Sequence, residues 1–111
     1  MAVYVGERAS DGARVLVDGR PLDPRQDLKA ISANGFEWTY EGAEPAQLAL
    51  ALLAHHLGDD ALALRLHQAF MRQVVANLAN EWTLTGEEID AALARLDPGA
   101  GKAAADKGGQ R

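Results

Sequence analysis

The stretch that decides the fold is residues 35–70, which read GFEWTYEGAEPAQLALALLAHHLGDDALALRLHQAF. Its start alternates apolar and polar side chains as a β-strand does, which would place Phe36, Trp38 and Tyr40 on one face. From Pro45 onward the apolar residues recur with helical spacing instead. A sheet-to-helix junction is therefore encoded within a few residues, and it predicts an α+β fold.

The residues before this stretch predict a small antiparallel sheet. They contain apolar runs with alternating character and β-branched side chains, which are typical of strands. Asp18 and Gly19 predict a hairpin, because both central positions of a type I′ turn need positive φ. Pro21 cannot donate to a β-ladder, so its strand should be short and lie at an edge. The expected strands, three to four in number, are residues 3–8, 14–17, 20–22 and 36–40.

The residues after Pro45 predict two helices that form an αα-hairpin. The first, ending near His56, is apolar all round, so it should pack centrally between the sheet and the other helices. Gly58 is a natural left-handed terminator, and Asp59 or Asp60 can cap the next helix. That second helix is amphipathic and is expected to run from about residue 60 to residue 79.

A capping box predicts the start of a third helix. The Thr85 hydroxyl and the Glu88 carboxylate have the spacing with which each satisfies a free amide of the first turn. This helix should end near Leu96. From Asp97 on, the chain has no apolar periodicity. We therefore predict one α+β domain over residues 1–96 and a disordered tail over residues 97–111.

Composition sets limits on the class of protein. The chain has 111 residues, which suits one small domain, and it has no cysteine. The lack of cysteine excludes disulfides and cysteine-ligated zinc, and it fits a reducing cytoplasm. No run approaches ~18 consecutive apolar residues, and residues 1–4 lack the features of a signal peptide. We therefore expect a cytoplasmic protein without a membrane partner.

The net charge is −5 at pH 7, and an acidic body disfavours binding to phosphate backbones. Basic or neutral protein surfaces are more compatible partners. Arg8, Arg14, Arg20 and Arg25 nevertheless cluster in the N-terminal third of the chain. They leave a nucleic-acid-binding module open as one alternative.

The histidines raise the question of a metal or catalytic site. His55 and His56 are adjacent on a helix, so their side chains diverge by about 100° and do not easily share an ion. His67 lies on the next predicted helix, and no His-x₃-His spacing occurs. We predict no metal, no cofactor and no catalytic residue. A small histidine-dependent hydrolase or metal-dependent enzyme is the alternative from another class.

Four segments together resemble one protein family: GFEW from Gly35, PAQLA from Pro45, HLGD from His56 and WTLT from Trp82. It is a family of small proteins of unknown function from bacterial genomes, plasmids and phages, and the resemblance covers about residues 3–92. It implies no catalytic residue. It implies an accessory role, in which a non-enzymatic protein binds a host protein. Inhibition of a host defence complex of the CRISPR-effector kind is one such role.

The junction between the predicted last strand and the first helix is the candidate interaction site. Glu37, Glu41 and Glu44 converge there beside the aromatic side chains of Trp38 and Tyr40. Aromatic anchors carry most of the binding energy at interfaces, while a charged rim steers and selects the partner. In the alternative interpretation both aromatic rings are buried in the core and the glutamates are only solvated.

Overall fold

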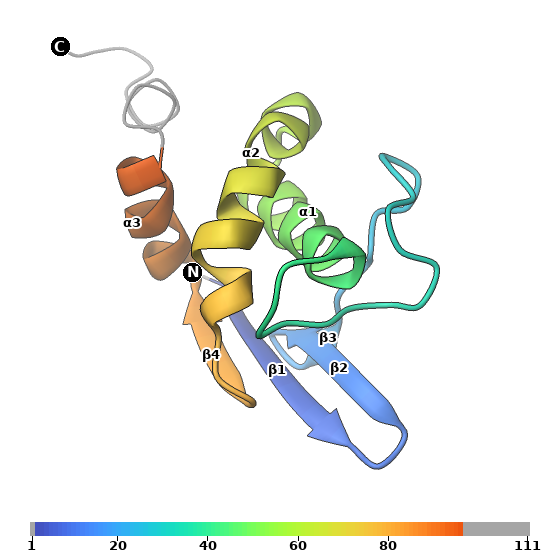
Figure 1. Ribbon diagram of the computed structural model, residues 1–111. Helices are drawn as coiled ribbons and strands as arrows, with labels where there is room; N and C mark the ends of the chain where they lie inside the picture. Colours follow the sequence, from blue (N-terminus) through green and yellow to red (C-terminus); the bar gives the residue numbers. More distant parts are fainter. Residues whose placement is uncertain (1, 97–111) are drawn as a thin grey trace, which may run out of the picture.

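The computed structural model describes residues 2–96, which form one four-stranded antiparallel sheet with the helices on one side of it (Figure 1). The predicted α+β fold is confirmed, while the predicted tail, residues 97–111, lies outside the described residues. The strands are β1 (Val3–Ala9), β2 (Gly12–Val17), β3 (Arg20–Pro21) and β4 (Trp82–Thr85). The helices are α1 (Ala43–Leu57), α2 (Asp60–Gln73) and α3 (Gly86–Leu96), with a 3-10 turn η1 (Val75–Asn77).

The sheet has the order β3-β2-β1-β4, with antiparallel pairing between all neighbours. The predicted tight turn between β2 and β3 is confirmed, because Asp18 and Gly19 have φ values of 50° and 83°. As expected, the strand that contains Pro21 is short and lies at an edge.

The fourth strand is not the predicted one. Residues 36–40 form no strand, and Thr39 has φ of 83°, which a pleated strand does not accommodate. The place beside β1 belongs to β4, with Trp82 opposite Gly6. No strand was predicted for residues 82–85, and Trp82 entered only through the family resemblance. Strand assignment therefore failed where pairing connects distant parts of the chain.

The glycine at position 6 explains how β4 fits against β1. A Cβ atom at Gly6 would lie 2.2 Å from the Cε2 and Nε1 atoms of Trp82, so only glycine leaves room for this indole. The ring is almost fully buried, and its Nε1–H has no hydrogen-bond partner among the described residues. A larger residue at position 6 would therefore prevent β4 from packing against β1 as it does here.

Helix α1 occupies the predicted central position. All residues from Pro45 to Ala54 are buried, and α1 packs closely against α2 (Figure 1). No helix within residues 2–96 has the length and apolar character needed to cross a membrane. The αα-hairpin turns at Gly58, whose φ is 64° and whose N–H donates to the Ala54 carbonyl oxygen.

Helix α2 ends earlier than predicted. It stops at Gln73 rather than near residue 79, and η1 follows. The side-chain amide of Asn77 donates to the carbonyl oxygens of Arg72 and Gln73, so it satisfies two of the last carbonyl groups of the helix. The helix starts as expected, with the Asp59 carboxylate accepting the Leu62 N–H at 3.0 Å.

The capping box before α3 is confirmed. The Glu88 N–H donates to the Thr85 hydroxyl oxygen at 3.1 Å, and the Thr85 N–H donates to the Glu88 carboxylate at 2.9 Å. Helix α3 then runs to Leu96, as predicted.

Residues 22–42 contain no helix or strand, yet they are fastened to α1 by one buried side chain. Gln47 is completely buried, and all four hydrogen-bonding positions of its amide group are used. Its oxygen accepts two backbone N–H groups, and its NH₂ group donates to two backbone carbonyl oxygens. The partners are Ile31 N (2.8 Å), Ser32 N (3.0 Å), Pro24 O (2.7 Å) and Lys29 O (3.1 Å).

Candidate functional site

Tyr40 is the exposed aromatic side chain at the corner where the irregular segment enters α1. It is 44% exposed, and Val3 is the only other large apolar residue that is exposed among residues 2–96. The Tyr40 hydroxyl donates to Glu44 Oε1 at 3.2 Å. A Cβ atom at Gly42 would lie 2.9 Å from the tyrosine ring, so the ring rests on the backbone just before α1. This packing orients the aromatic surface toward solvent.

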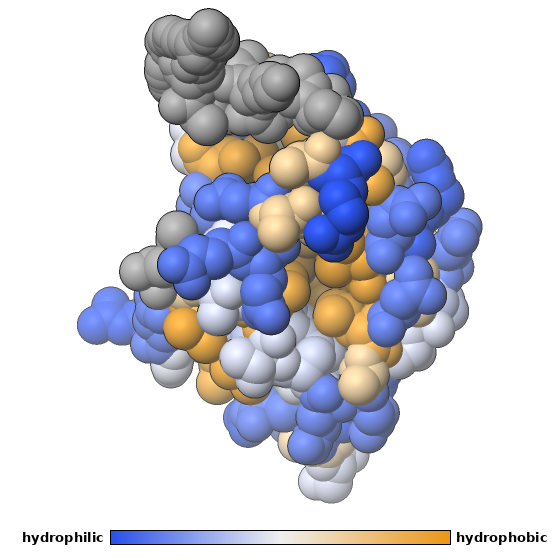
Figure 2. Space-filling model, turned by 90° about the vertical axis from the view of Figure 1, so that its left-hand side faces the viewer, coloured by the Kyte–Doolittle hydropathy of each residue, from blue (hydrophilic) through white to orange (hydrophobic). Residues whose placement is uncertain are grey.

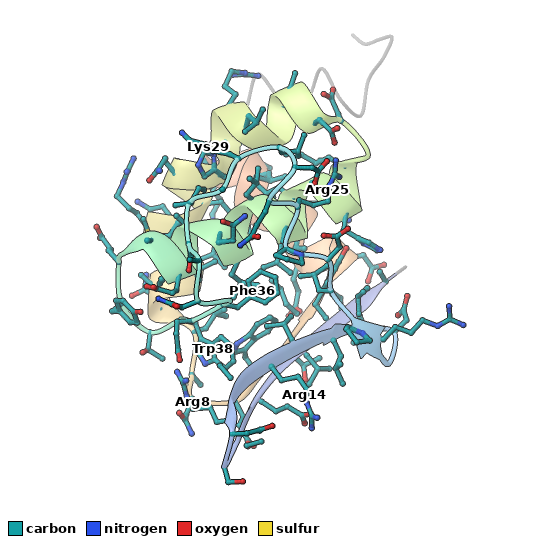
Figure 3. All side chains as sticks on the ribbon, turned by 90° about the vertical axis from the view of Figure 1, so that its right-hand side faces the viewer. Arg8, Arg14, Arg25, Lys29, Phe36 and Trp38 are labelled. Carbon is teal, nitrogen blue, oxygen red and sulfur yellow. The ribbon has the colours of Figure 1, made fainter. Side chains whose placement is uncertain are left out.

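Trp38 lies beneath this corner and is fully buried, so it is core rather than an exposed anchor. Its Nε1–H donates to the Asn80 carbonyl oxygen at 2.9 Å, and its ring meets Trp82 edge to face at 5.6 Å. The Arg8 guanidinium carbon lies 4.5 Å from the Trp38 ring centroid (Figure 3). Trp38 is buried and Tyr40 is exposed. The two rings are therefore neither both exposed anchors nor both part of the core.

Glu37 connects the corner to the sheet. Its carboxylate accepts from the Arg8 Nη1–H at 2.6 Å, and the Arg8 Nε–H donates to Asn80 Oδ1 at 2.6 Å. Both side chains of the ion pair are about one-third exposed, so solvent screens their attraction. The pair therefore contributes more to the placement of the corner than to its stability.

Glu41 and Glu44 give the corner its negative charge. Neither carboxylate forms an ion pair with another residue in the range 2–96. Partial desolvation, together with the nearby carboxylates of Glu44 and Glu37, raises the pKa of the Tyr40 hydroxyl. The tyrosine therefore keeps its proton at neutral pH and donates it to Glu44. An aromatic face beside unpaired carboxylates suits a cationic group.

The three histidines have separate partners and do not form a common site. The contacts are His55 Nδ1 with the Tyr4 hydroxyl (2.7 Å), His56 Nε2 with Asp90 Oδ1 (2.6 Å) and His67 Nδ1 with the Leu64 carbonyl oxygen (2.6 Å). Within residues 2–96, no group of three or more His, Cys, Asp or Glu side chains is placed to hold a metal ion. Burial, and secondarily the charge of Asp18, raise the pKa of the Tyr4 hydroxyl to about 12.

The N-terminal arginines do not form one basic surface. In Figure 3, Arg25 and Lys29 lie at the opposite end of the molecule from Arg8 and Arg14. Three of the four arginines singled out in the sequence are neutralised by carboxylates. The pairs are Arg8 with Glu37 (2.6 Å), Arg14 with Glu7 (2.7 Å), and Arg25 with Asp27 (3.0 Å) and Asp60 (3.2 Å).

A groove of about 410 Å³ lies between α2 and α3. The face of the molecule that carries α3 shows exposed apolar side chains between polar ones (Figure 2). The groove is lined by Gln73, Val74, Ala92, Arg95 and Leu96. One guanidinium and one amide are its polar side chains, and this set includes neither a nucleophile nor a general base.

Two residues of the corner were missed by sequence reasoning. Arg8 was considered only as part of a basic cluster, and Asn80 was not considered. They lie 72 positions apart in the chain, and no local periodicity links them. The role of Arg8 follows from its contacts with the Glu37 carboxylate and the Trp38 indole. Only the fold brings these groups together, so the sequence alone did not reveal it.

The fold and the corner together define a small two-layer α+β domain with a surface suited to binding. The chain belongs to the DUF6166 family, a family of unknown function, which matches residues 4–95. This confirms the resemblance to a family of unknown function that spans nearly the whole predicted domain. None of the curated proteins and none of the solved structures compared with the chain matches it.

Proposed function

We propose that the protein is a non-enzymatic binding module that docks on another protein through an acidic corner, defined as Glu37, Tyr40, Glu41 and Glu44. The observation that carries this proposal is the exposure of Tyr40 beside the carboxylates of Glu41 and Glu44, which form no ion pair with a cationic residue among residues 2–96. Exposed tyrosines supply large contact areas at little cost in conformational entropy. The corner therefore combines an anchor with a charged rim.

The chemistry of the corner selects a basic partner surface. A lysine or arginine side chain that stacks on the Tyr40 ring gains a cation–π contact, and Glu41 and Glu44 supply the opposite charge. The net charge of −5 adds long-range attraction to such a partner and increases the association rate. Burial of Trp38 beneath the corner keeps the anchor in place before binding.

The resemblance to proteins of bacterial genomes, plasmids and phages supports a host protein as the partner. Accessory proteins of this kind act on host complexes, and we propose a defence complex such as a CRISPR effector as the target class. The lack of cysteine is compatible with action in a reducing cytoplasm. The enzyme and nucleic-acid alternatives gain no supporting geometry from residues 2–96, because the histidines are dispersed and three N-terminal arginines are ion-paired.

The proposal is tested by affinity capture of the full chain from a bacterial lysate, followed by binding kinetics with the captured partner. Tyr40→Ala should weaken binding by at least tenfold, mainly through faster dissociation, because it removes the anchor. The double variant Glu41→Lys and Glu44→Lys should slow association and reduce its dependence on salt.

The matched control is Glu87→Lys, which reverses an exposed charge on α3 outside the acidic corner. It should leave the dissociation rate unchanged and alter association only through the net charge. If Tyr40→Ala and Glu87→Lys bind equally well, the interface lies outside the acidic corner and the proposal is wrong.

A further inference from the structure

The sheet has a second face that no helix within residues 2–96 covers. All three helices lie on the opposite side, where Tyr4 and Val15 are buried (Figure 1). On the uncovered face, Thr83, Val5, Leu16 and Pro21 form one row across all four strands, because Val5 pairs with both Thr83 and Leu16, and Leu16 pairs with Pro21.

This row is unusually apolar for an uncovered face. Antiparallel sheets with one solvated side normally alternate apolar inward and polar outward residues. Here Val5 and Leu16 stand at the centre of the outer face and are only half-buried. Val3 points to the same side two positions earlier in β1 and is 36% exposed. The outer face therefore has an apolar centre that the described part of the chain leaves uncovered.

One ion pair stands beside this apolar row. Glu7 and Arg14 are directly opposite each other on β1 and β2, and their side chains meet at 2.7 Å. The Glu7 side chain is 35% exposed and that of Arg14 is 58% exposed, so each can contact a further charged group. The outer face is thus electrically balanced, although the chain as a whole is acidic.

We propose that this face binds a second copy of the chain, with a two-fold axis parallel to the strands and midway between β1 and β2. Because the strand order is β3-β2-β1-β4, this axis places β1 over β2 of the second copy and β4 over β3 of the second copy. Val5 then faces Leu16 of the second copy, and Glu7 faces Arg14 of the second copy. Apolar groups meet apolar groups and opposite charges meet.

The charge pattern selects this axis over the other two-fold arrangement of two stacked sheets. An axis perpendicular to the strands, at the level of Val5 and Leu16, would bring Arg14 near Asp18 of the second copy but would place Glu7 over apolar Val3, so only one of the two charges would find a partner. The strand-parallel axis instead creates an alternating ring of four charges. Stacked sheets related in this way pack with nearly aligned strands, as in β-sandwiches.

The size of the face sets the expected strength of the dimer. The outer face consists of four strands about 4.8 Å apart with three rows of side chains. The surface area that it can bury is far less than the roughly 800 Å² per partner of a standard interface. We therefore expect a weak dimer, with a dissociation constant on the order of 100 μM. Arg8, which supports the acidic corner, points to the helix side of the sheet and stacks on Trp38. Dimer formation therefore leaves the acidic corner free.

The test is analytical ultracentrifugation of the full chain at about 150 mM salt over roughly 10 μM to 1 mM, a range that spans the expected dissociation constant. The wild-type mass should rise toward that of a dimer. Glu7→Arg leaves two basic side chains, at positions 7 and 14, on the outer face, and Arg14→Glu leaves two acidic ones at the same positions. Each variant alone should be monomeric, whereas an equimolar mixture of the two should dimerise again, because opposite charges then meet across the axis.

A wild-type protein that stays monomeric at about 1 mM would overturn the inference, as would single variants that dimerise as well as the wild type. Dilution of the ¹⁵N-labelled wild type gives an independent readout. Amide chemical shifts should change on β1 and β2, and changes confined to the helices would place the interface elsewhere. Loss of the dimer without any effect on capture of a host partner separates this inference from the proposed function.

Discussion

Replacing Gln47 by leucine tests whether one buried amide holds the long irregular segment onto α1. Gln47→Leu keeps the approximate volume but removes four hydrogen bonds to backbone groups of residues 24–32. A buried polar group left without a partner costs about 1–3 kcal/mol, so four such groups would cost up to about 12 kcal/mol if the segment stayed in place. That sum is comparable to the whole stability of a domain of this size.

The segment has a less costly response, because it can lift away from α1 and hydrate its backbone groups. The loss is then limited to the contacts that this part of the chain makes with the core, including those of Leu28 and Ile31. We expect Gln47→Leu to lower the free energy of unfolding by about 4 kcal/mol. Urea unfolding monitored by tryptophan fluorescence measures this change, since both tryptophans are buried.

Hydrogen exchange distinguishes local release from global destabilisation. The Ile31 and Ser32 amides should lose their protection in Gln47→Leu while amides in the middle of α1 keep theirs. Gln73→Leu is the matched control, because Gln73 is exposed in the last turn of α2 and should change stability by less than about 0.5 kcal/mol. If Gln47→Leu is as stable as this control and keeps the Ile31 amide protected, the fastening role is refuted.

Three further changes test other parts of the fold. Gly6→Ala should destabilise the protein by about 3 kcal/mol, because its Cβ would overlap the Trp82 indole; Trp82→Val in that background should restore part of the loss, as measured by urea unfolding. Tyr4 has a pKa of about 12 against about 10 unfolded, so its stabilisation is complete below pH 10 and falls by about 2–3 kcal/mol as pH rises to 12; Tyr4→Phe should abolish that part of the alkaline slope. Leu52→Asp should prevent folding, because this α1 residue is fully buried; a soluble variant with a cooperative thermal transition would contradict the central position of α1.

Signals that depend on neighbouring residues were predicted well. The left-handed stop at Gly58, the capping box at Thr85 and the tight turn at Asp18 each rest on a few adjacent positions, and each is found in the structure. The fourth strand depends instead on which distant segment pairs with β1. Residues 36–40 and 82–85 both alternate, and the difference lies in the space that Gly6 leaves for Trp82.

The candidate site was predicted in part for the same reason. Tyr40 and Glu44 are four positions apart and their side chains form a hydrogen bond, whereas the binding role of these residues stays a prediction. The positive φ of Thr39 turns the chain between the two aromatics, so that Trp38 enters the core and Tyr40 does not. Strand periodicity assumes extended backbone at every position and therefore placed both rings on one face.

The pairing of β1 with β4 has a consequence for the order in which the protein is made. Residues 3–6 leave the ribosome long before residues 82–85. The hairpin of β1 and β2 can therefore form early, while the edge of β1 that later pairs with β4 has no neighbour. During that interval the groove above Gly6 lacks its indole, and the backbone of β1 is open to any extended segment. When β4 pairs with β1, Trp82 fills the space above Gly6 and the open edge of β1 is covered at the same time. Docking of β4 is therefore the step that completes the native sheet.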